Sequence, residues 1–325
     1  MRRRHFLETC GAALSAPLAF GCTQSASRRV PAAAPPPQTS RVDGSFAELL
    51  MTGSGDPSLR PKLVAHPALA AIVRHQKLSG NSMATPESAL NDVFKGLERH
   101  PPTRSVLDAW RGRDTELLEA ATAASRYLPQ GNVFSGKVFL VAGYDIGVAA
   151  PPDLLLNVAH PHFTADPQEL GFYATHEAHH VGFLALRSAP ALTDLNQAPK
   201  LRAVVSFMTQ LEGMGVHAAY PARSEQHRLE GDDDYHVYVD STQAKAVTER
   251  YAELTTTLAQ TDGELEDELV GTVLNAMSSG ERVWYRFGAL VCWRLEQQQG
   301  RQALIAAIRD PRLFEAAVKD LLLKG

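Results

Sequence analysis

The stretch His176-Glu177-Ala178-His179-His180 contains the spacing His-Glu-x-x-His, which constrains the fold more than any other part of the chain. On an α-helix each residue turns about 100°, so His176 and His180 lie on one face, one turn apart. Two imidazoles in this arrangement can bind a single zinc ion. Glu177 lies about 60° further round, where its carboxylate can take the proton from an attacking water and return it to a leaving amine. The motif therefore predicts a helix that carries a zinc site and its general base.

The residues around the motif predict the helix that carries it. Asp166 and Pro167 have the pattern of an N-cap followed by a first-turn proline, and Glu169 is placed as a capping-box acid. An apolar periodicity then continues to Leu186, so we expect the motif helix to cover about residues 167–187. The alternative is a buried helix whose histidines are bonded to backbone carbonyls.

Glu212 is the best candidate for the third protein ligand that a catalytic zinc needs. It follows His180 in a second predicted helix, about residues 199–219, among apolar residues and beside glycines that would let another helix come close. A glutamate in such a run is costly to bury unless it is paired or bound to a metal. His217 is the alternative ligand or a contact of the ligands, and an exposed position for Glu212 is the structural alternative.

Tyr285 is our candidate for a phenol that donates a hydrogen bond to the oxyanion of a tetrahedral intermediate. It lies in a helix predicted over residues 278–299, in which a core tyrosine is the structural alternative. His217, Tyr235 and His236 are alternatives for the same role.

The motif and its downstream glutamate together resemble a known group of enzymes. The pair His176-Glu177-x-x-His180 with Glu212-Gly213 is similar to the gluzincin branch of zinc metallopeptidases. More narrowly, it resembles zinc-dependent peptidases grouped as domains of unknown function with a His-Glu-x-His-His core. Their late tyrosine-x-x-glycine helix is similar to the segment 285–288 here. The resemblance covers about residues 63–314 and implies a gluzincin fold, a zinc cofactor and peptide hydrolysis.

Two apolar runs before the motif helix predict a small sheet. Residues 137–143 are bounded by glycines, and residues 154–159 follow Pro151-Pro152, which is typical of short strands. We expect residues 154–159 to form an exposed edge to which an extended peptide adds by β-augmentation. An ordinary interior strand is the alternative.

Two polar segments near the motif are interpreted as surface. His160 and His162 flank Pro161, which forces an extended turn, so we expect them in a loop or at the rim of the site. Residues 221–241 are polar and include three consecutive aspartates, and we interpret this segment as a solvated loop or a lid.

The fold class expected from these patterns is α+β, mostly helical and zincin-like. A short β-sheet precedes the motif helix, and the C-terminal part is helical. The N-terminal half carries no recognisable chemistry and is expected to pack behind the site. The other helical segments are predicted at residues 63–78, 88–97, 106–127, 244–260 and 264–277, with a last helix opened by Asp310-Pro311.

The first residues have the features of an export signal. Arg3 and Arg4, followed by an alanine-rich run, resemble a twin-arginine signal over residues 1–22, with an ordinary secretory signal as the alternative. A partial lipobox ends at Cys22, whose lipidation would attach the protein to a membrane. Residues 23–42 form an Ala/Pro-rich linker before a single domain over residues 43–325. We therefore expect a periplasmic or cell-envelope protein.

Composition excludes several other classes. Hydrophobic residues make up 44% of the chain and charged residues 21%, as in globular domains. The net charge of −4, without a basic stripe, gives no sign of a nucleic-acid partner. We expect no transmembrane helix in the mature chain. Cys292 is the one cysteine outside the signal, which leaves no pair for an intramolecular disulfide.

The sequence thus predicts an exported zinc metallopeptidase that acts on a peptide or protein substrate. Zn²⁺ is expected on His176, His180 and Glu212, with Glu177 as general base. One alternative is a non-catalytic zinc-binding envelope lipoprotein, against which the intact Glu177 argues. A ferritin-like di-iron oxidase is less favoured, because it needs a second Glu-x-x-His pair that the chain lacks.

Overall fold

The computed structural model describes residues 41–53 and 56–324. The export signal, the lipobox and nearly all of the linker lie outside these residues and stay predictions. Among the described helices, none combines the length and the hydrophobicity that crossing a membrane requires.

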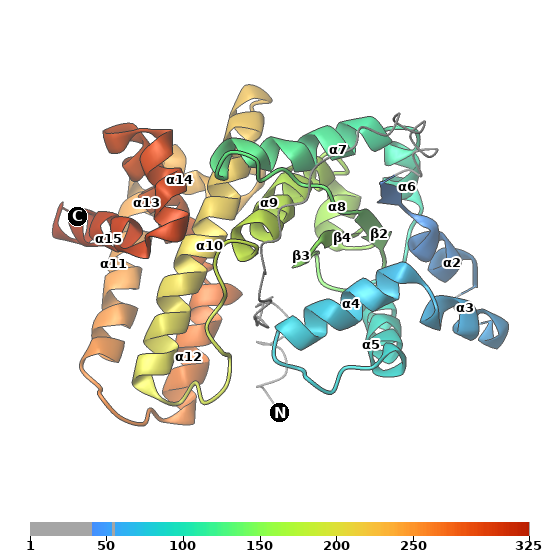
Figure 1. Cartoon of the computed structure of the whole chain (residues 1–325), viewed down its shortest axis with the longest axis horizontal. Coiled ribbons are helices and arrows are strands. Elements are labelled where there is room, and N and C mark those ends of the chain that lie inside the picture. The colour runs from blue at the N-terminus through green and yellow to red at the C-terminus, as the bar shows by residue number, and fades with distance from the viewer. Residues whose placement is uncertain (1–40, 54–55, 325) are drawn as a thin grey trace, which may run out of the picture.

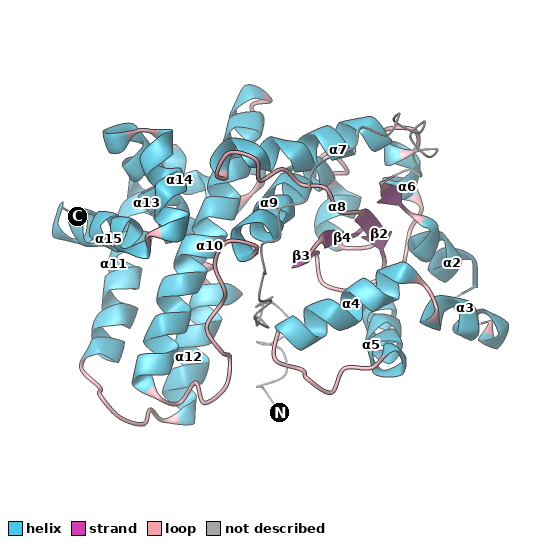
Figure 2. Ribbon diagram, in the orientation of Figure 1, coloured by secondary structure: helices cyan, strands magenta, loops and turns pink. Residues whose placement is uncertain are grey.

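Helices make up most of the described chain, and a small sheet lies in its first half, which agrees with the predicted mostly helical α+β class (Figure 2). The first half contains α2 Ser45–Gly53, α3 Arg60–Val64, α4 Pro67–Leu78, α5 Pro86–Arg99, α6 Ser105–Trp110, α7 Asp114–Ala123 and α8 Pro161–Ala165. The second half contains α9 Glu169–Leu184, α10 Ala198–Glu225, α11 Ser241–Ala259, α12 Asp267–Ser278, α13 Val283–Gln299, α14 Arg301–Arg309 and α15 Pro311–Lys324.

The sheet has four short strands in the order β1-β2-β4-β3. They are β1 Val42–Asp43, β2 Val138–Val141, β3 Gly147–Ala150 and β4 Asp153–Asn157. β2 and β4 are parallel, whereas β3 is antiparallel to β4 and forms one edge. The prediction that residues 154–159 form the edge was wrong, since β4 is hydrogen-bonded on both sides. The edge belongs to β3, which the sequence pattern did not indicate.

Helix α9 separates two hydrophobic cores, with the sheet and α2–α8 on one side and α10–α15 on the other (Figure 1). The core around the sheet receives Leu170, Ala174 and Ala178 from α9. The core among the C-terminal helices receives Phe172 and Phe183 from the same helix. Because α9 is buried on both sides, its polar motif residues are held inside the protein rather than on its surface.

Glycines let α10 and α13 cross at backbone contact. A Cβ on Gly288 would lie 2.1 Å from the carbonyl oxygen of Thr209, and a Cβ on Gly213 would lie 2.2 Å from the carbonyl carbon of Gly288. Helices that meet through larger side chains stay 8–10 Å apart. The crossing brings the turns that carry Glu212 and Tyr285 to the same cavity.

The N-terminal helices hold the segment that leads into β3. Nδ1 of the buried His75 in α4 lies 2.7 Å from the hydroxyl oxygen of Tyr144, and the side-chain amide of Asn157 donates to the Tyr144 carbonyl at 2.5 Å. Gly96 in α5 lies against Gly143, so that a Cβ on Gly96 would meet the Gly143 oxygen at 2.0 Å. The start of the edge strand is therefore fixed from outside the sheet.

The glycine crossing predicts a large effect of a single methyl group. Gly288→Ala should lower the free energy of unfolding by about 1–3 kcal/mol, because the methyl group has no space between α10 and α13. Gly271→Ala in α12 is the matched control. This helical glycine is exposed with nothing near its Cβ position, so alanine should add up to about 1 kcal/mol. Urea titrations measure the free energy of unfolding of both variants. Equal changes in the two would contradict the close contact between α10 and α13 at Gly288.

The buried His75 predicts a loss of stability in acid. Burial lowers the pKa of His75 to about 4, so the unfolded chain, in which the pKa is about 6.5, binds this proton more tightly. The stabilisation that the neutral His75 gives the folded protein is fully present above pH 6.5. It is lost as the pH drops towards 4, and at pH 4.5 the loss is about 2–3 kcal/mol. His75→Gln should lose less stability between pH 7 and 4.5 in urea titrations. Equal losses in both proteins would rule out this origin.

Candidate metal centre

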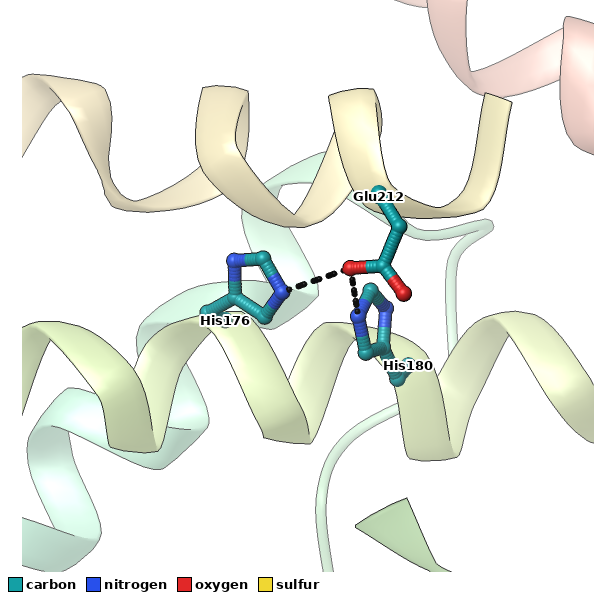
Figure 3. A group of neighbouring side chains, drawn as sticks. All are labelled: His176, His180 and Glu212. Atoms are coloured by element: carbon teal, nitrogen blue, oxygen red, sulfur yellow. Dashed lines mark hydrogen bonds and ion pairs between the residues drawn. The ribbon is translucent and has the colours of Figure 1, made fainter. Parts of the chain in front are cut away.

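Three predicted ligands meet between α9 and α10. Figure 3 shows His176 and His180 pointing from α9 towards Glu212 on α10. Oε2 of Glu212 lies 3.1 Å from Nε2 of His176 and 2.9 Å from Nε2 of His180. All three side chains are buried, and their ligand atoms lie within 4.8 Å of one another. The helical spacing of the motif and the buried acid in the middle of the facing helix produce this convergence.

A glycine allows α10 to pass directly over the two imidazoles. A Cβ on Gly215 would lie 2.7 Å from Cε1 of His180 and 2.9 Å from Cε1 of His176. Any larger residue at this position would displace either the imidazoles or α10 and so disturb the contacts between the histidines and Glu212. The short distance between the helices is thus part of the site.

The ionisation of Glu212 and His176 suits a bound cation, whereas His180 would have to release a proton to it: burial lowers the pKa of His180, but the adjacent Glu212 carboxylate raises it above its usual value. Burial alone would raise the pKa of the Glu212 carboxyl, but the adjacent His180 and His176 lower it to about 2. Burial and the neighbouring His180 lower the pKa of His176, which favours a neutral imidazole there. A carboxylate and neutral imidazoles are the forms that bind metals, and two histidines with one glutamate are a known zinc donor set. The residues present therefore fit zinc.

Glu177 lies between this centre and the edge of the sheet. Burial raises the pKa of its carboxyl to about 8, although the nearby His180 lowers it. The backbone N–H of Ala149 in β3 donates to this carboxyl. A Cβ on Gly147 would come within 3.2 Å of Cγ of Glu177, so the small residue at the start of β3 gives the carboxyl its space. The same side chain thus borders the ligands and the strand edge.

A cavity opens beside the ligands. Tyr285 lines it, with its ring stacked on that of His176 at a centroid distance of 6.4 Å. Tyr173 lines it as well, one turn before His176 on α9, with ring centroids 6.3 Å apart. Tyr173 is not among the site residues predicted from the sequence, although its spacing of three residues from His176 places both side chains on the same face of α9. His75 also lines the cavity, so the expectation that the N-terminal half only packs behind the site was wrong.

Of the three alternative oxyanion donors, His217 and His236 lie close to other residues, and Tyr235 lines the cavity. The Nε2 of His217 lies 2.6 Å from Oε2 of Glu296, and its Nδ1 lies 3.1 Å from the hydroxyl of Tyr238, so both ring nitrogens are engaged away from the three ligands. His236 is half-buried, and its Nε2 lies 3.3 Å from the carbonyl oxygen of Glu230. Tyr235 lines the cavity, and the guanidinium of Arg223 lies 4.3 Å from the centre of its ring.

Ion pairs hold the segment that we expected to be a solvated loop or lid. α10 continues through Pro221 to its last residue, Glu225, and Asp233–Tyr238 forms a 3₁₀ helix. Arg223, which is buried, pairs with Glu169 at the start of α9 and with Asp232. That expectation was wrong because Asp232 meets Arg223 at the end of α10 and the buried Asp234 meets Arg282 at the start of α13.

A second cluster of metal-binding residue types lies in this ion-pair network. His162, Glu169 and Asp232 have ligand atoms within 4.8 Å of one another, and Nε2 of His162 lies 3.2 Å from Oε2 of Glu169. The guanidinium of Arg223 already bonds both carboxylates. A cation of the protein itself therefore neutralises this cluster. His160 accepts from the His162 backbone N–H as the N-cap of α8, and neither histidine is among the three ligands.

Comparison with known proteins gives one match. A family model described as "Putative zinc dependent peptidase (DUF5700)" matches residues 70–317, which is more than half of the chain and includes the motif helix, Glu212 and Tyr285. Neither a curated protein nor a solved structure matches. The resemblance to a zinc-peptidase family is thereby confirmed at this level, while the gluzincin assignment stays a prediction. The chain belongs to the family that carries this description.

Proposed function

We propose that this protein is a zinc metallopeptidase whose metal is held by His176, His180 and Glu212. The observation that carries the proposal is the convergence of these buried side chains beside a cavity that Glu177 also lines. A structural zinc site is usually closed by four protein ligands. Three ligands next to a cavity instead leave a position for water or substrate, which favours catalysis over a purely structural role.

The chain's own residues divide the chemistry between them. A zinc ion on the three ligands would supply a Lewis acid that acidifies a water and polarises a substrate carbonyl. The raised pKa of Glu177 falls when a cation occupies the ligands, and its carboxyl, then ionised, accepts the proton of the attacking water and donates it to the leaving amine. Tyr285, whose ring lies beside that of His176, donates a hydrogen bond to the oxygen of the attacked carbonyl. The outer edge of β3 lies next to Glu177, to which the Ala149 N–H donates, and has no strand partner among the described residues, so it can pair with an extended peptide.

Removal of the third ligand tests the metal site. Glu212→Ala should reduce zinc from one ion per chain to a small fraction after dialysis, because two histidines alone hold zinc weakly. Elemental analysis of the purified protein measures this, with Glu268→Ala, an exposed helical acid, as the control. Zinc retention by Glu212→Ala would show that the third ligand is misassigned. Two irons per chain in the wild type would support an oxidase instead.

Removal of the base separates catalysis from metal binding. Glu177→Gln should keep its zinc and lose about 10²–10⁴-fold in kcat, since the amide cannot accept the proton. Hydrolysis of a peptide mixture, followed by mass spectrometry, gives the rate beside the zinc content. Turnover of Glu177→Gln at the wild-type rate would show that Glu177 is not the general base.

The phenol of Tyr285 has a smaller expected effect. Tyr285→Phe should retain zinc and lower kcat by about 10²-fold or more, with little change in KM, because the hydrogen bond forms as the oxyanion develops. Tyr173→Phe is the matched comparison, because the Tyr173 ring also lies beside that of His176 and lines the same cavity. A larger loss in Tyr173→Phe than in Tyr285→Phe would exchange their roles.

A further inference from the structure

Arg282 occupies an unusual backbone position at the edge of the metal cavity. It is the N-cap residue of α13, with φ +53°, in the left-handed region that favours glycine, asparagine and aspartate. Its side chain does not cap the helix but lines the cavity. A strained position that keeps an arginine indicates that its side chain, rather than its backbone, is needed there.

The guanidinium of Arg282 is held rigidly along one edge. Nε donates to Oδ1 of Asp234 at 2.8 Å, and Nη2 donates to Oδ2 at 2.5 Å. The guanidinium carbon lies 3.9 Å from the centre of the Tyr285 ring, in a cation–π contact. Asp234 is buried, whereas the Arg282 side chain keeps 36% of its surface exposed. Within the described residues, the opposite edge of the fork, which carries Nη1, makes no hydrogen bond.

The charges around the cavity single out this group as an anion site. Among the described residues, Arg282 is the one arginine or lysine that lines the cavity. Asp232 is paired with Arg223, as Asp234 is with Arg282. A substrate carboxylate therefore has Arg282 as its one cationic arginine or lysine partner along the described wall of the cavity.

The geometry also limits how far such an anion lies from the reacting bond. The rings of His176 and Tyr285 are 6.4 Å apart, and the guanidinium lies 3.9 Å from the Tyr285 ring. An extended peptide covers about 3.3–3.6 Å per residue. About three residues of extended peptide therefore span the distance from the His176 ring to the Arg282 guanidinium.

We propose that Arg282 binds a carboxylate of the peptide substrate and makes the enzyme prefer peptides with a carboxylate within about three residues of the cleaved bond. A planar fork with a free edge suits bidentate binding of a carboxylate, which a lysine cannot reproduce. The carboxylate comes either from the C-terminus of the peptide or from an acidic side chain. This inference rests on the proposed peptidase function.

Matched peptides test the proposal on the zinc-loaded full chain. A peptide found to be cleaved in a mixture is made with a C-terminal carboxylate and with a C-terminal amide, the cleaved bond lying two residues from the end. The amidated peptide is also made with Glu or Gln next to the cleaved bond. We expect one carboxylate form to have a kcat/KM at least about tenfold higher than its neutral partner, a difference that corresponds to about 1.4 kcal/mol.

Variants of Arg282 then assign the preference to this residue. In Arg282→Gln the ratio between carboxylate and neutral peptides should fall to about one, and in Arg282→Lys, which keeps a cation beside the buried Asp234, it should fall part of the way. If Arg282→Gln does not fold, the inference is tested by whether the ratio of kcat/KM between carboxylate and neutral peptides falls in Arg282→Lys. Arg286→Gln, one turn along α13 and not among the residues that line the cavity, should keep the wild-type ratio.

The outcomes distinguish the inference from the function on which it rests. A preference for the C-terminal carboxylate indicates a carboxypeptidase-type enzyme, and a preference for Glu over Gln indicates recognition of an acidic side chain. Equal cleavage of both members of each pair, or a ratio unchanged in both Arg282 variants, would overturn the inference and leave the peptidase function standing. If the zinc-loaded protein cleaved no peptide, the function and the inference would both fall.

Discussion

The burial of one carboxylate between two imidazoles is the interaction on which the rest of the structure depends. A buried, isolated charge is costly, so Glu212 needs close and well-oriented partners. His176 and His180 provide them at 3.1 and 2.9 Å, and this requires α9 and α10 to lie unusually close. Gly215 makes room on the side of α9. Gly213 makes room on the opposite side, where α13 crosses. One short stretch of α10 therefore sets the positions of both neighbouring helices.

Helix α9 packs against both hydrophobic cores, and this packing makes the site rigid. Side chains anchored in the interior have few alternative rotamers, because protein cores are densely packed. The histidines of the motif therefore have little freedom before a metal binds. Pre-organisation of this kind reduces the entropy lost on binding and keeps the three ligands in one geometry.

The parts of the site that could be predicted from the sequence are those that depend on local geometry. The spacing of His176 and His180 predicts a shared helix face, and the cost of burying an acid indicates Glu212. The structure brings these residues together with Tyr285, whose segment Tyr-x-x-Gly contains the glycine of the helix crossing. Local reasoning succeeded because helix period and burial cost do not depend on distant pairings.

The parts that could not be predicted depend on contacts distant in sequence. β3 has only four residues, Gly-Val-Ala-Ala, so its periodicity is too short to indicate a strand, and which strand forms the edge follows from the order of pairing. The aspartates 232 and 234 give the appearance of a solvated loop until Arg223 and Arg282 are placed beside them. In the same way, His75 reaches the cavity only because α4 lies next to the sheet.

The anchoring of Tyr144 by His75 has a consequence for the evolution of the fold. The His-Glu-x-x-His motif and the proposed third ligand lie within the second half of the chain, which suggests at first that this half could exist alone. The edge strand, however, starts from a segment that α4 and α5 hold in place. A shortened descendant that began at β2 would keep His176, His180 and Glu212 but lose the fixed start of the strand that we propose binds substrate. The N-terminal helices and the half that carries the motif are therefore expected to be inherited together.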